Sequence, residues 1–116
     1  MRLSSVGIGI DVVKISRFKS RSYESHKSFY KKMFSKSEID YCRKFKEPYR
    51  HFAGKFAIKE AVKKSISEEI GLTHIRTGHS NSKPTVSIIG SKYRFLVSVS
   101  HEQDTAVAVV ISEKVK

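Results

Sequence analysis

Near the start of the chain, residues 6–12 alternate between large apolar residues and small or polar ones. From residue 6 to 13 the even positions are aliphatic, whereas the odd positions include Gly7, Gly9 and Asp11. Because successive side chains of a strand point to opposite faces, we predict a strand with an aliphatic face and a nearly bare one. The bare face lets another group approach closely. That group is either a ligand beside Asp11 or a packed helix that Asp11 caps.

Helical periodicity follows this strand. We predict a short helix over residues 14–22, a loop over 22–26, helical packing over 27–34 and another helix from Ser35 until Pro48. The last of these opens with a capping box, in which Ser35 is the N-cap and Glu38 is the third helical residue. Pro48 ends or resets it. Arg17 and Arg21, four residues apart, would form a basic stripe on the first helix.

The segment 52–64 is the strongest helix prediction, because it contains good helix formers and no proline. Three lysines at intervals of four residues, the first of which is Lys55, would share one stripe. Glu60 lies off this stripe, among small and aromatic side chains, one turn before Lys64. Such a carboxylate needs compensation by a metal ion, a lysine or a ligand. A simple Glu60–Lys64 ion pair is the structural alternative.

The last third of the chain reads as strands. We predict a loop over residues 73–83, opened by a short strand around 73–76, and then strands over 84–90, 96–101 and 105–111. The last two are close enough to form a hairpin. The expected fold class is therefore α+β: a single domain over residues 1–116, with several helices packed on a small, mostly antiparallel sheet.

Composition narrows the environment and the partners. The 116 residues hold a single cysteine, Cys42, so no intrachain disulfide is possible. The opening residues lack the apolar core of a signal peptide, and no apolar run approaches the roughly 20 residues that span a bilayer. We therefore expect a cytoplasmic protein that does not insert into a membrane. The formal charge of +12 favours an anionic partner, such as nucleic acid, a phosphate-rich molecule or an acidic protein.

Three polar residues could meet in the fold: Asp11 at a strand end, Glu60 on a helix and His101 near a hairpin turn. Two carboxylates suit Mg²⁺, which prefers oxygen ligands and often shares its shell with substrate phosphates. Zinc is disfavoured by the single cysteine and the lack of paired histidines. No phosphate-binding glycine loop or serine-hydrolase motif occurs in the sequence.

Several motifs, in order, resemble those of the holo-[acyl-carrier-protein] synthases. They are Gly7-Ile8-Gly9-Ile10-Asp11 followed by Arg17, Phe34 to Glu38 with Tyr41-Cys42-Arg43, Phe52 to Ala61, Ser82-Lys83-Pro84, and Ser98 to His101. The matches span almost the whole chain. The resemblance implies a 4′-phosphopantetheinyl transferase, which moves the phosphopantetheine arm of coenzyme A to a serine of an acyl carrier protein and releases adenosine 3′,5′-bisphosphate.

The resemblance also implies roles for individual residues. Asp11 and Glu60 would hold Mg²⁺. The phosphates of coenzyme A would contact Lys55, Lys64 and His101, and the catalytic residues would be Glu60 and Lys64. An acidic carrier would dock at Arg17 and Arg21. Either Glu60 or a metal-bound water would take the serine proton. The family is trimeric, with each active site between two subunits. A polyanionic substrate and an acidic carrier would account for the charge without nucleic acid as a partner.

Two departures keep alternatives open. Residues 65–71 stand where the family usually has Gly-Thr-Gly-Ile-Gly, and they place Glu68 and Glu69 near the expected phosphates. Ser82 replaces the usual glycine before Lys-Pro. A relative that binds coenzyme A without transferring its arm, and a basic nucleic-acid-binding module, are therefore the alternative functions.

Overall fold

The computed structural model describes residues 5–115 and contains four α-helices and five strands in these residues. In chain order the elements are β1 (Val6–Lys14), α1 (Ser16–Lys19), α2 (Lys27–Lys31), α3 (Lys36–Arg43), α4 (Pro48–Ser65), the 3-10 turn η1 (Leu72–His74), β2 (Ile75–Ser80), β3 (Lys83–Ile88), β4 (Tyr93–Glu102) and β5 (Thr105–Lys114). The predicted α+β class is confirmed.

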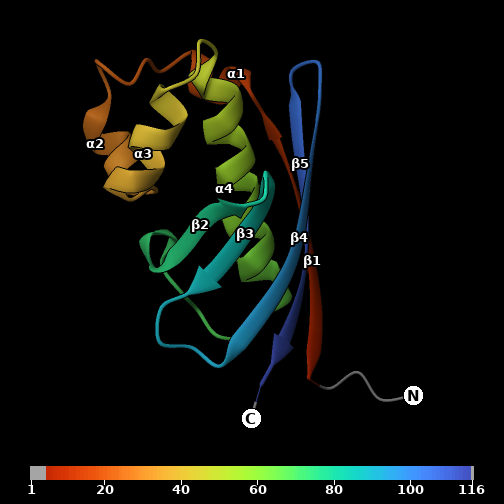
Figure 1. Cartoon of the computed structure of the whole chain (residues 1–116). Helices are drawn as coiled ribbons and strands as arrows, with labels where there is room; N and C mark the ends of the chain where they lie inside the picture. Colours follow the sequence, from red (N-terminus) through yellow and green to blue (C-terminus); the bar gives the residue numbers. More distant parts are fainter. Residues whose placement is uncertain (1–4, 116) are drawn as a thin grey trace.

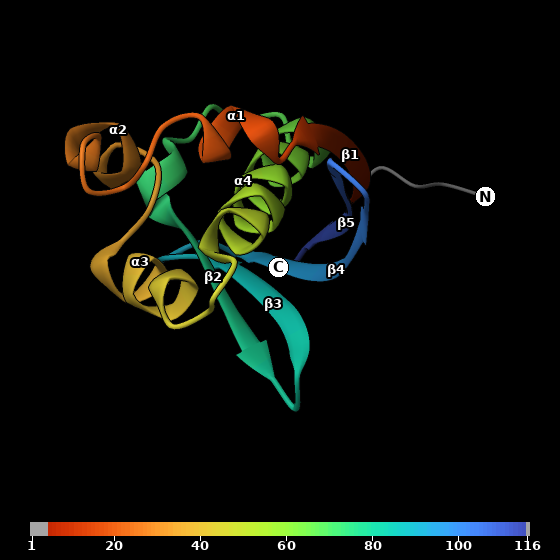
Figure 2. The same ribbon diagram turned by 90° about the horizontal axis from the view of Figure 1, so that it is seen from above.

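The strands form two antiparallel groups, a three-stranded sheet in the order β1-β5-β4 and the hairpin β2-β3. Helix α4 lies along one face of the sheet, with the hairpin and the short helices on its other sides (Figures 1 and 2). Pro48 is its first residue, a position where the missing N–H costs nothing. Since nearly every turn of α4 is buried, this helix is the central element of the fold.

Glycines let β1 touch α4 with its backbone. A Cβ atom on Gly7 would lie 1.8 Å from the carbonyl oxygen of Ser65, and one on Gly9 would lie 1.9 Å from that of Ala61. The predicted close approach is thus made by a helix, although Asp11 does not cap one. The N-cap residue of α1 is Ile15, which makes no side-chain capping bond.

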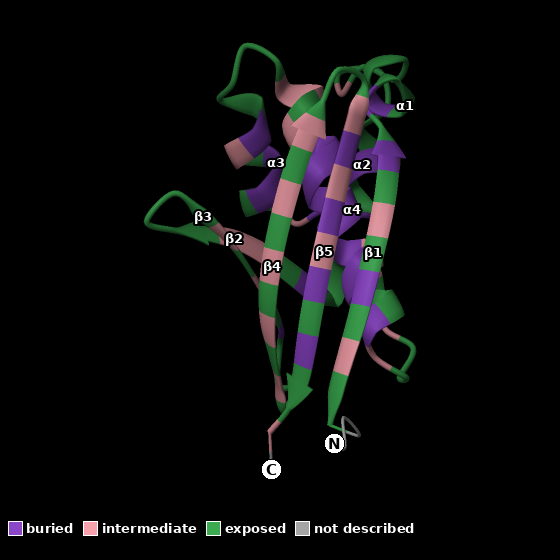
Figure 3. Ribbon diagram, turned by 90° about the vertical axis from the view of Figure 1, so that its right-hand side faces the viewer, coloured by how far each residue is buried: buried purple, intermediate pink, exposed green. Residues whose placement is uncertain are grey.

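The opposite face of β1 is exposed. Ile8 is 69%, Ile10 is 57% and Val12 is 63% accessible. On β4, Leu96 is also exposed, so the outer face of the sheet carries an apolar surface (Figure 3). Such a surface is unusual for a strand that ordinarily buries its aliphatic side, and it is typical of a contact with another polypeptide.

Aromatic packing joins the helices. The ring of Tyr30 lies 4.7 Å from that of Phe52 between centroids, and its hydroxyl donates to the carbonyl oxygens of Phe18 and Arg21 at 3.1 and 2.6 Å. Burial raises the pKa of the Tyr30 phenol well above its usual value. This core fixes α1 and α2 against α4.

The predicted helix over residues 14–22 is wrong in extent, because Lys14 still pairs with Thr105 in the sheet. The loop between β4 and β5 then holds the chain: Asp104 accepts hydrogen bonds from the backbone N–H of Ser16 at 2.9 Å and from its hydroxyl at 2.8 Å. The helix therefore starts at Ser16 and ends at Lys19. The neighbouring helices are also shorter than predicted, whereas the Ser35–Glu38 capping box is confirmed.

The predicted loop over residues 73–83 is also wrong. Most of it belongs to the β2-β3 hairpin, whose two turn residues, Asn81 and Ser82, have φ angles of 51° and 67°. Tight hairpins need such positive angles. The sequence pattern did not predict β2 because this strand contains the poor strand formers Gly78, His79 and Ser80. Within residues 5–115, no helix is both long and apolar enough to cross a bilayer.

Candidate functional site

Helix α4 separates the predicted site residues into two groups. Asp11, Glu60 and Lys64 lie on the side where α4 meets β1, and these three residues together are called here the carboxylate groove. Lys55 and His101 line a cavity on the other side, toward β3 and β4. Positions 60 and 64 are one turn apart, and they point roughly opposite to positions 51, 55 and 58. The expectation that Asp11, Glu60 and His101 meet is therefore wrong within a single chain.

In the carboxylate groove, the close packing of Gly9 on Ala61 sets the position of Asp11. Two residues further along the strand, Asp11 lies beside the turn of α4 that carries Glu60. Lys64 Nζ donates to Asp11 Oδ1 and to the carbonyl oxygen of Ile10, each at 3.0 Å. Asp11 is thus paired with the ammonium group of Lys64.

The partner expected for Glu60 was wrong. Its nearest cation is Lys63, at 3.9 Å, rather than Lys64, which turns to Asp11 instead. Within the described chain, the Glu60 carboxylate accepts no hydrogen bond, and its side chain is 28% exposed. This carboxylate is therefore free to bind a cation or to accept a proton.

The donor set of the groove fits Mg²⁺. Residues 5–115 contain no cluster of three or more histidine, cysteine, aspartate or glutamate side chains that could enclose a metal ion. Mg²⁺ is commonly bound through one or two carboxylates and fills its remaining positions with water and phosphate oxygens. Asp11 and Glu60 would be those carboxylates, and Lys64 would lie beside any phosphate that joins them.

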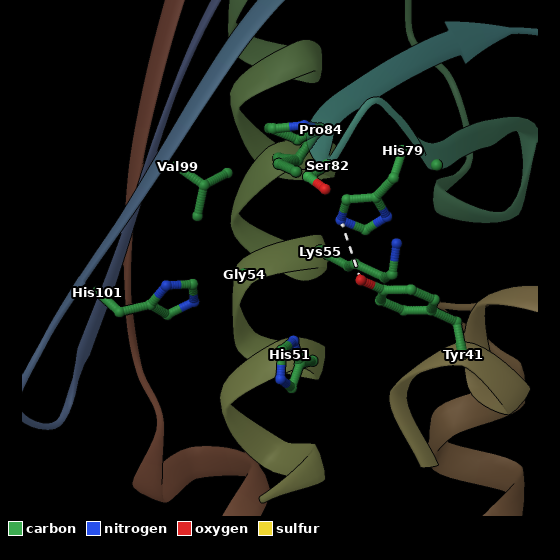
Figure 4. Close-up of a pocket in the computed structure, with 11 residues that line it drawn as sticks. Tyr41, His51, Gly54, Lys55, His79, Ser82, Pro84, Val99 and His101 are labelled. Carbon is green, nitrogen blue, oxygen red and sulfur yellow. Dashed lines mark hydrogen bonds between the residues drawn. The ribbon is translucent and has the colours of Figure 1, made fainter. Parts of the chain in front are cut away.

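The cavity on the other side of α4 has a volume of about 470 Å³. Its walls are Tyr41, His51, Gly54, Lys55, Ile58, Gly78, His79, Ser82, Pro84, Val99 and His101 (Figure 4). No aspartate or glutamate occurs among these described lining residues. A cavity with a lysine, three histidines and no acid is suited to an anion, and its aromatic wall is suited to a flat ring.

The histidines of the cavity are weak bases. The pKa values of His51, His79 and His101 all lie below the ordinary histidine value, chiefly because partial burial disfavours the charged imidazolium. Positive neighbours add to this effect: Lys55 lowers the pKa of His79, and Arg50 lowers that of His101. An incoming anion would offset the effect of these positive neighbours and favour the imidazolium form, so the cavity can gain protons when it binds one.

Lys55 is the buried cation of the cavity. Its residue is 4% exposed, its Nζ donates to Thr77 Oγ1 at 3.0 Å, and it lies 4.7 Å from the centre of the Tyr41 ring. Burial lowers the pKa of this ammonium group. The Tyr41 ring stacks on His79 at 4.6 Å and 24°, which closes that wall.

The two candidate docking arginines are exposed but do not form the predicted helical stripe. Arg21 lies beyond the end of α1. The guanidinium of Arg17 lies 4.7 Å from the centre of the Phe56 ring, and that of Arg21 lies 4.7 Å from the Phe29 ring. Each guanidinium group thus packs on an aromatic ring, while the arginine residue remains exposed to solvent.

The loop over residues 66–71, after α4, contains Glu68, whose side chain contacts neither the carboxylate groove nor the cavity. Glu68 accepts a hydrogen bond from the Tyr93 hydroxyl at 2.5 Å and lies 3.5 Å from Lys114 Nζ. These contacts, of which the bond from Tyr93 is the strongest, lower the pKa of Glu68 to about 2. Glu68 is therefore engaged by β4 and β5.

Sequence reasoning did not assign Tyr41, His51 and His79 to the site. A weak signal existed for Tyr41, which belongs to one of the motifs described above. His79 was hidden inside the predicted loop, and nothing in the sequence places the β2-β3 hairpin over α3.

Known proteins that resemble this chain indicate its family. Residues 7–111 match the 4′-phosphopantetheinyl transferase superfamily. A holo-[acyl-carrier-protein] synthase from Thermodesulfovibrio yellowstonii is 36% identical over 109 residues, which cover 90% of this chain and 96% of the relative. One from Chlamydia trachomatis is 36% identical over 119 residues, covering 92% of this chain and 98% of the relative.

Solved structures show the same fold. A holo-(acyl-carrier-protein) synthase from Bacillus anthracis, in complex with coenzyme A (3′,5′-ADP), has a TM-score of 0.78 at 26% identity and covers 93% of this chain and 96% of its own. The Helicobacter pylori enzyme in complex with coenzyme A has a TM-score of 0.77 at 30% identity, with coverage of 91% and 99%. With its sequence motifs, fold and relatives in agreement, the chain belongs to the holo-[acyl-carrier-protein] synthase family of 4′-phosphopantetheinyl transferases.

Proposed function

We propose that this protein transfers the 4′-phosphopantetheine arm of coenzyme A to a serine of an acyl carrier protein, in a reaction that requires Mg²⁺ and releases adenosine 3′,5′-bisphosphate. The relatives bear the name of this activity, and two structural neighbours were solved with coenzyme A. The observation that carries the proposal is the acid-free cavity with its buried lysine, because it is suited to a phosphate-rich ligand.

The cavity would hold the phosphates at the nucleotide end of coenzyme A. Lys55 supplies a fixed positive charge, and His101 supplies a ring nitrogen at the opposite wall (Figure 4). His101 Nε2 lies 3.2 Å from the carbonyl oxygen of Arg50, which orients the ring. Gly54 keeps this wall open, since a Cβ there would lie 3.0 Å from the same nitrogen.

The carboxylate groove would hold the reacting diphosphate. Asp11 and Glu60 would bind Mg²⁺, which when bound neutralises charge on the phosphate oxygens. Lys64, oriented by Asp11 and Ile10, would donate to a phosphate oxygen. Glu60 is the carboxylate able to accept the proton of the attacking serine. Phosphoryl transfer depends mainly on such positioning and charge neutralisation, so these few groups suffice.

The separation of the two groups supports a site shared between copies of the chain. In a homotrimer, the cavity of one copy would face the carboxylate groove of the next. The exposed aliphatic side chains of Ile8, Ile10, Val12 and Leu96 supply a surface for such an assembly. Light scattering coupled to gel filtration measures the mass of the particle, and a monomeric active enzyme would refute the shared site.

The carrier would dock at the exposed arginines. Arg17 and Arg21 present positive charge close to the aromatic core, and an acidic carrier complements this charge. Arg17→Glu should therefore weaken binding of the carrier more than binding of coenzyme A. Titration of the variant with each ligand separately measures both affinities, and an equal loss of the two would contradict a docking role.

Mass spectrometry tests the activity itself. An apo carrier protein is incubated with the enzyme, coenzyme A and Mg²⁺, and a mass gain of one phosphopantetheine per carrier supports the proposal. Binding of coenzyme A without any mass gain would identify the protein as an inactive relative. A salt-sensitive gel shift with nucleic acid that is indifferent to Mg²⁺, with no affinity for coenzyme A, would favour the nucleic-acid-binding alternative.

A further inference from the structure

A continuous set of hydrogen bonds joins the centre of the protein to the wall of the cavity. It starts at Lys59, which is fully buried. Lys59 Nζ donates to the carbonyl oxygens of Met33 at 2.8 Å and Leu72 at 3.0 Å, and to Glu38 Oε1 at 2.7 Å. An ammonium group has three hydrogens, so Lys59 has no further hydrogen to donate to a ligand.

Glu38 is the second member of this set. Its Oε1 also accepts from the backbone N–H of Ser35 at 2.8 Å, and its Oε2 accepts from both the N–H and the hydroxyl of Thr77, at 2.8 and 2.6 Å. Burial raises the pKa of Glu38, but the bonds from Lys59, Thr77 and Ser35 together lower it further than burial raises it. The carboxyl group is therefore ionised and can only accept.

The ionised carboxylate fixes the direction of the Thr77 hydroxyl. Because Glu38 cannot donate, the hydroxyl hydrogen of Thr77 must point to Oε2, which leaves its oxygen lone pairs for Lys55. Lys55 Nζ lies 3.0 Å from that oxygen. Among the described residues, no carboxylate oxygen lies within 4.0 Å of Lys55 Nζ. Lys55 is thus held by a neutral acceptor, and its charge is not cancelled by a direct ion pair.

From this arrangement we infer that Glu38 and Thr77 are positioning residues, which orient Lys55 in the cavity so that its charge remains available to a phosphate ligand. A carboxylate in direct contact with Lys55 would compete with the ligand, whereas a hydroxyl placed between them holds the ammonium group without neutralising it. The identity of the ligand as coenzyme A rests on the proposed function. The orientation of Lys55 by Thr77 does not depend on the proposed function.

Other groups near Lys55 define what the experiment must control. The titratable and charged neighbours are Glu38, Tyr41 and Cys42 on α3, His51 and Lys59 on α4, and His79 on β2. A substitution at Thr77 leaves these residues in place, but loss of its hydroxyl also removes one of the hydrogen bonds that Glu38 Oε2 accepts. Thr77→Val keeps the shape of the side chain and the backbone bond to Glu38 but removes the hydroxyl. Thr77→Ser keeps the hydroxyl and is the matched control.

The first measurement needs no ligand. Carbon-13 labelling of the lysine ε positions allows the Lys55 pKa to be followed by NMR, with Lys55→Gln identifying the resonance. Loss of the accepting oxygen should lower the Lys55 pKa in Thr77→Val and leave it unchanged in Thr77→Ser. An unchanged pKa in a folded Thr77→Val protein would overturn the inference, whether or not the protein binds coenzyme A.

The second measurement is calorimetric titration with coenzyme A. Thr77→Val should weaken binding by about tenfold, the size of a hydrogen bond to a charged group, and Thr77→Ser should restore it. In a Lys55→Gln background, Thr77→Val should cause no further loss, because its effect passes through Lys55. Equal losses in the two backgrounds would show a general structural role and overturn the inference. Failure of the wild type to bind coenzyme A would instead refute the proposed ligand.

Discussion

Lys59 and Glu60 are neighbours in sequence, yet their charges are compensated to very different degrees within the protein. Lys59 is enclosed by three oxygen acceptors, one of them a carboxylate that is itself fully hydrogen-bonded. Glu60 has only a distant lysine, at 3.9 Å, and remains partly exposed. The chain thus compensates one charge internally and leaves the next for an external partner.

This contrast separates charges that build the protein from charges that serve a ligand. A buried ion pair contributes little net stability over an apolar pair, but it is costly to break from one side only. An uncommitted carboxylate costs the fold little to change and contributes directly to cation binding. Substitutions at Lys59 and at Glu60 should therefore fail in different assays.

The largest effect is expected from the carboxylate groove. Asp11→Ala and Glu60→Ala should each abolish phosphopantetheine transfer, a fall of at least about a hundredfold, because the loss of either carboxylate removes stabilisation of the transition-state charge. The thermal midpoint should change little. The carrier mass assay with coenzyme A measures the loss, and Glu68→Ala, whose carboxylate contacts Tyr93, is the matched control. Full activity in Asp11→Ala or Glu60→Ala would remove that residue from the site.

A single substitution in the buried pair of Lys59 and Glu38 should instead lower the stability of the protein. Lys59→Met or Glu38→Leu alone should cost about 3–5 kcal/mol of unfolding free energy, because each leaves a buried charge without its partner. The double variant should cost less than the two singles combined. Urea unfolding of the four proteins completes the cycle. Strict additivity would show that the two side chains do not stabilise each other.

A smaller loss of unfolding free energy should follow from adding a side chain where β1 packs against α4. Gly9→Ala places a Cβ 1.9 Å from the carbonyl oxygen of Ala61, so β1 must move away from α4 at a cost of about 1–3 kcal/mol. The shift also displaces Asp11 and should weaken Mg²⁺ binding in the carboxylate groove. Gly71→Ala, whose Cβ would lie 3.3 Å from His74 Nδ1, is the control for stability. Equal stability of the two variants would contradict the tight contact.

The smallest effect concerns pH. The pKa values of His51, His79 and His101 are lowered in the free protein, and a bound phosphate would raise them, so the complex holds more protons than the free cavity. Affinity for coenzyme A should therefore increase as pH falls from about 8 to about 6.5, by a few-fold and at most about tenfold per proton gained. Calorimetry across this range measures it, and His74→Gln, outside the cavity, should leave the trend intact. An affinity independent of pH would exclude proton uptake.

Local patterns predicted the parts of the fold that depend on near neighbours. The alternation of β1, the capping box at Ser35 and Glu38, the long helix α4 and the β4-β5 hairpin all follow from spacing along the chain. Gly7 and Gly9 even indicated that something approaches β1 closely. The identity of that partner could not be read, because it comes from a helix more than forty residues away.

The lysines of α4 show what spacing cannot predict. Lys55 and Lys59 share a stripe with Lys63, as expected, yet the first two are buried and the third is exposed. The difference comes from segments distant in the sequence, which supply Thr77 to Lys55 and Glu38 to Lys59. For the same reason Lys55 could be assigned to the site from resemblance alone, and its partner Thr77 could not.

The aliphatic outer face of β1 has a consequence for how this enzyme is handled. If neighbouring copies cover Ile8, Ile10 and Val12, the free energy of the folded state includes an association term that follows mass action. Dilution would then lower the melting temperature and the specific activity together. Measurements made at nanomolar and at micromolar protein would describe two different populations, so the protein concentration belongs beside every rate.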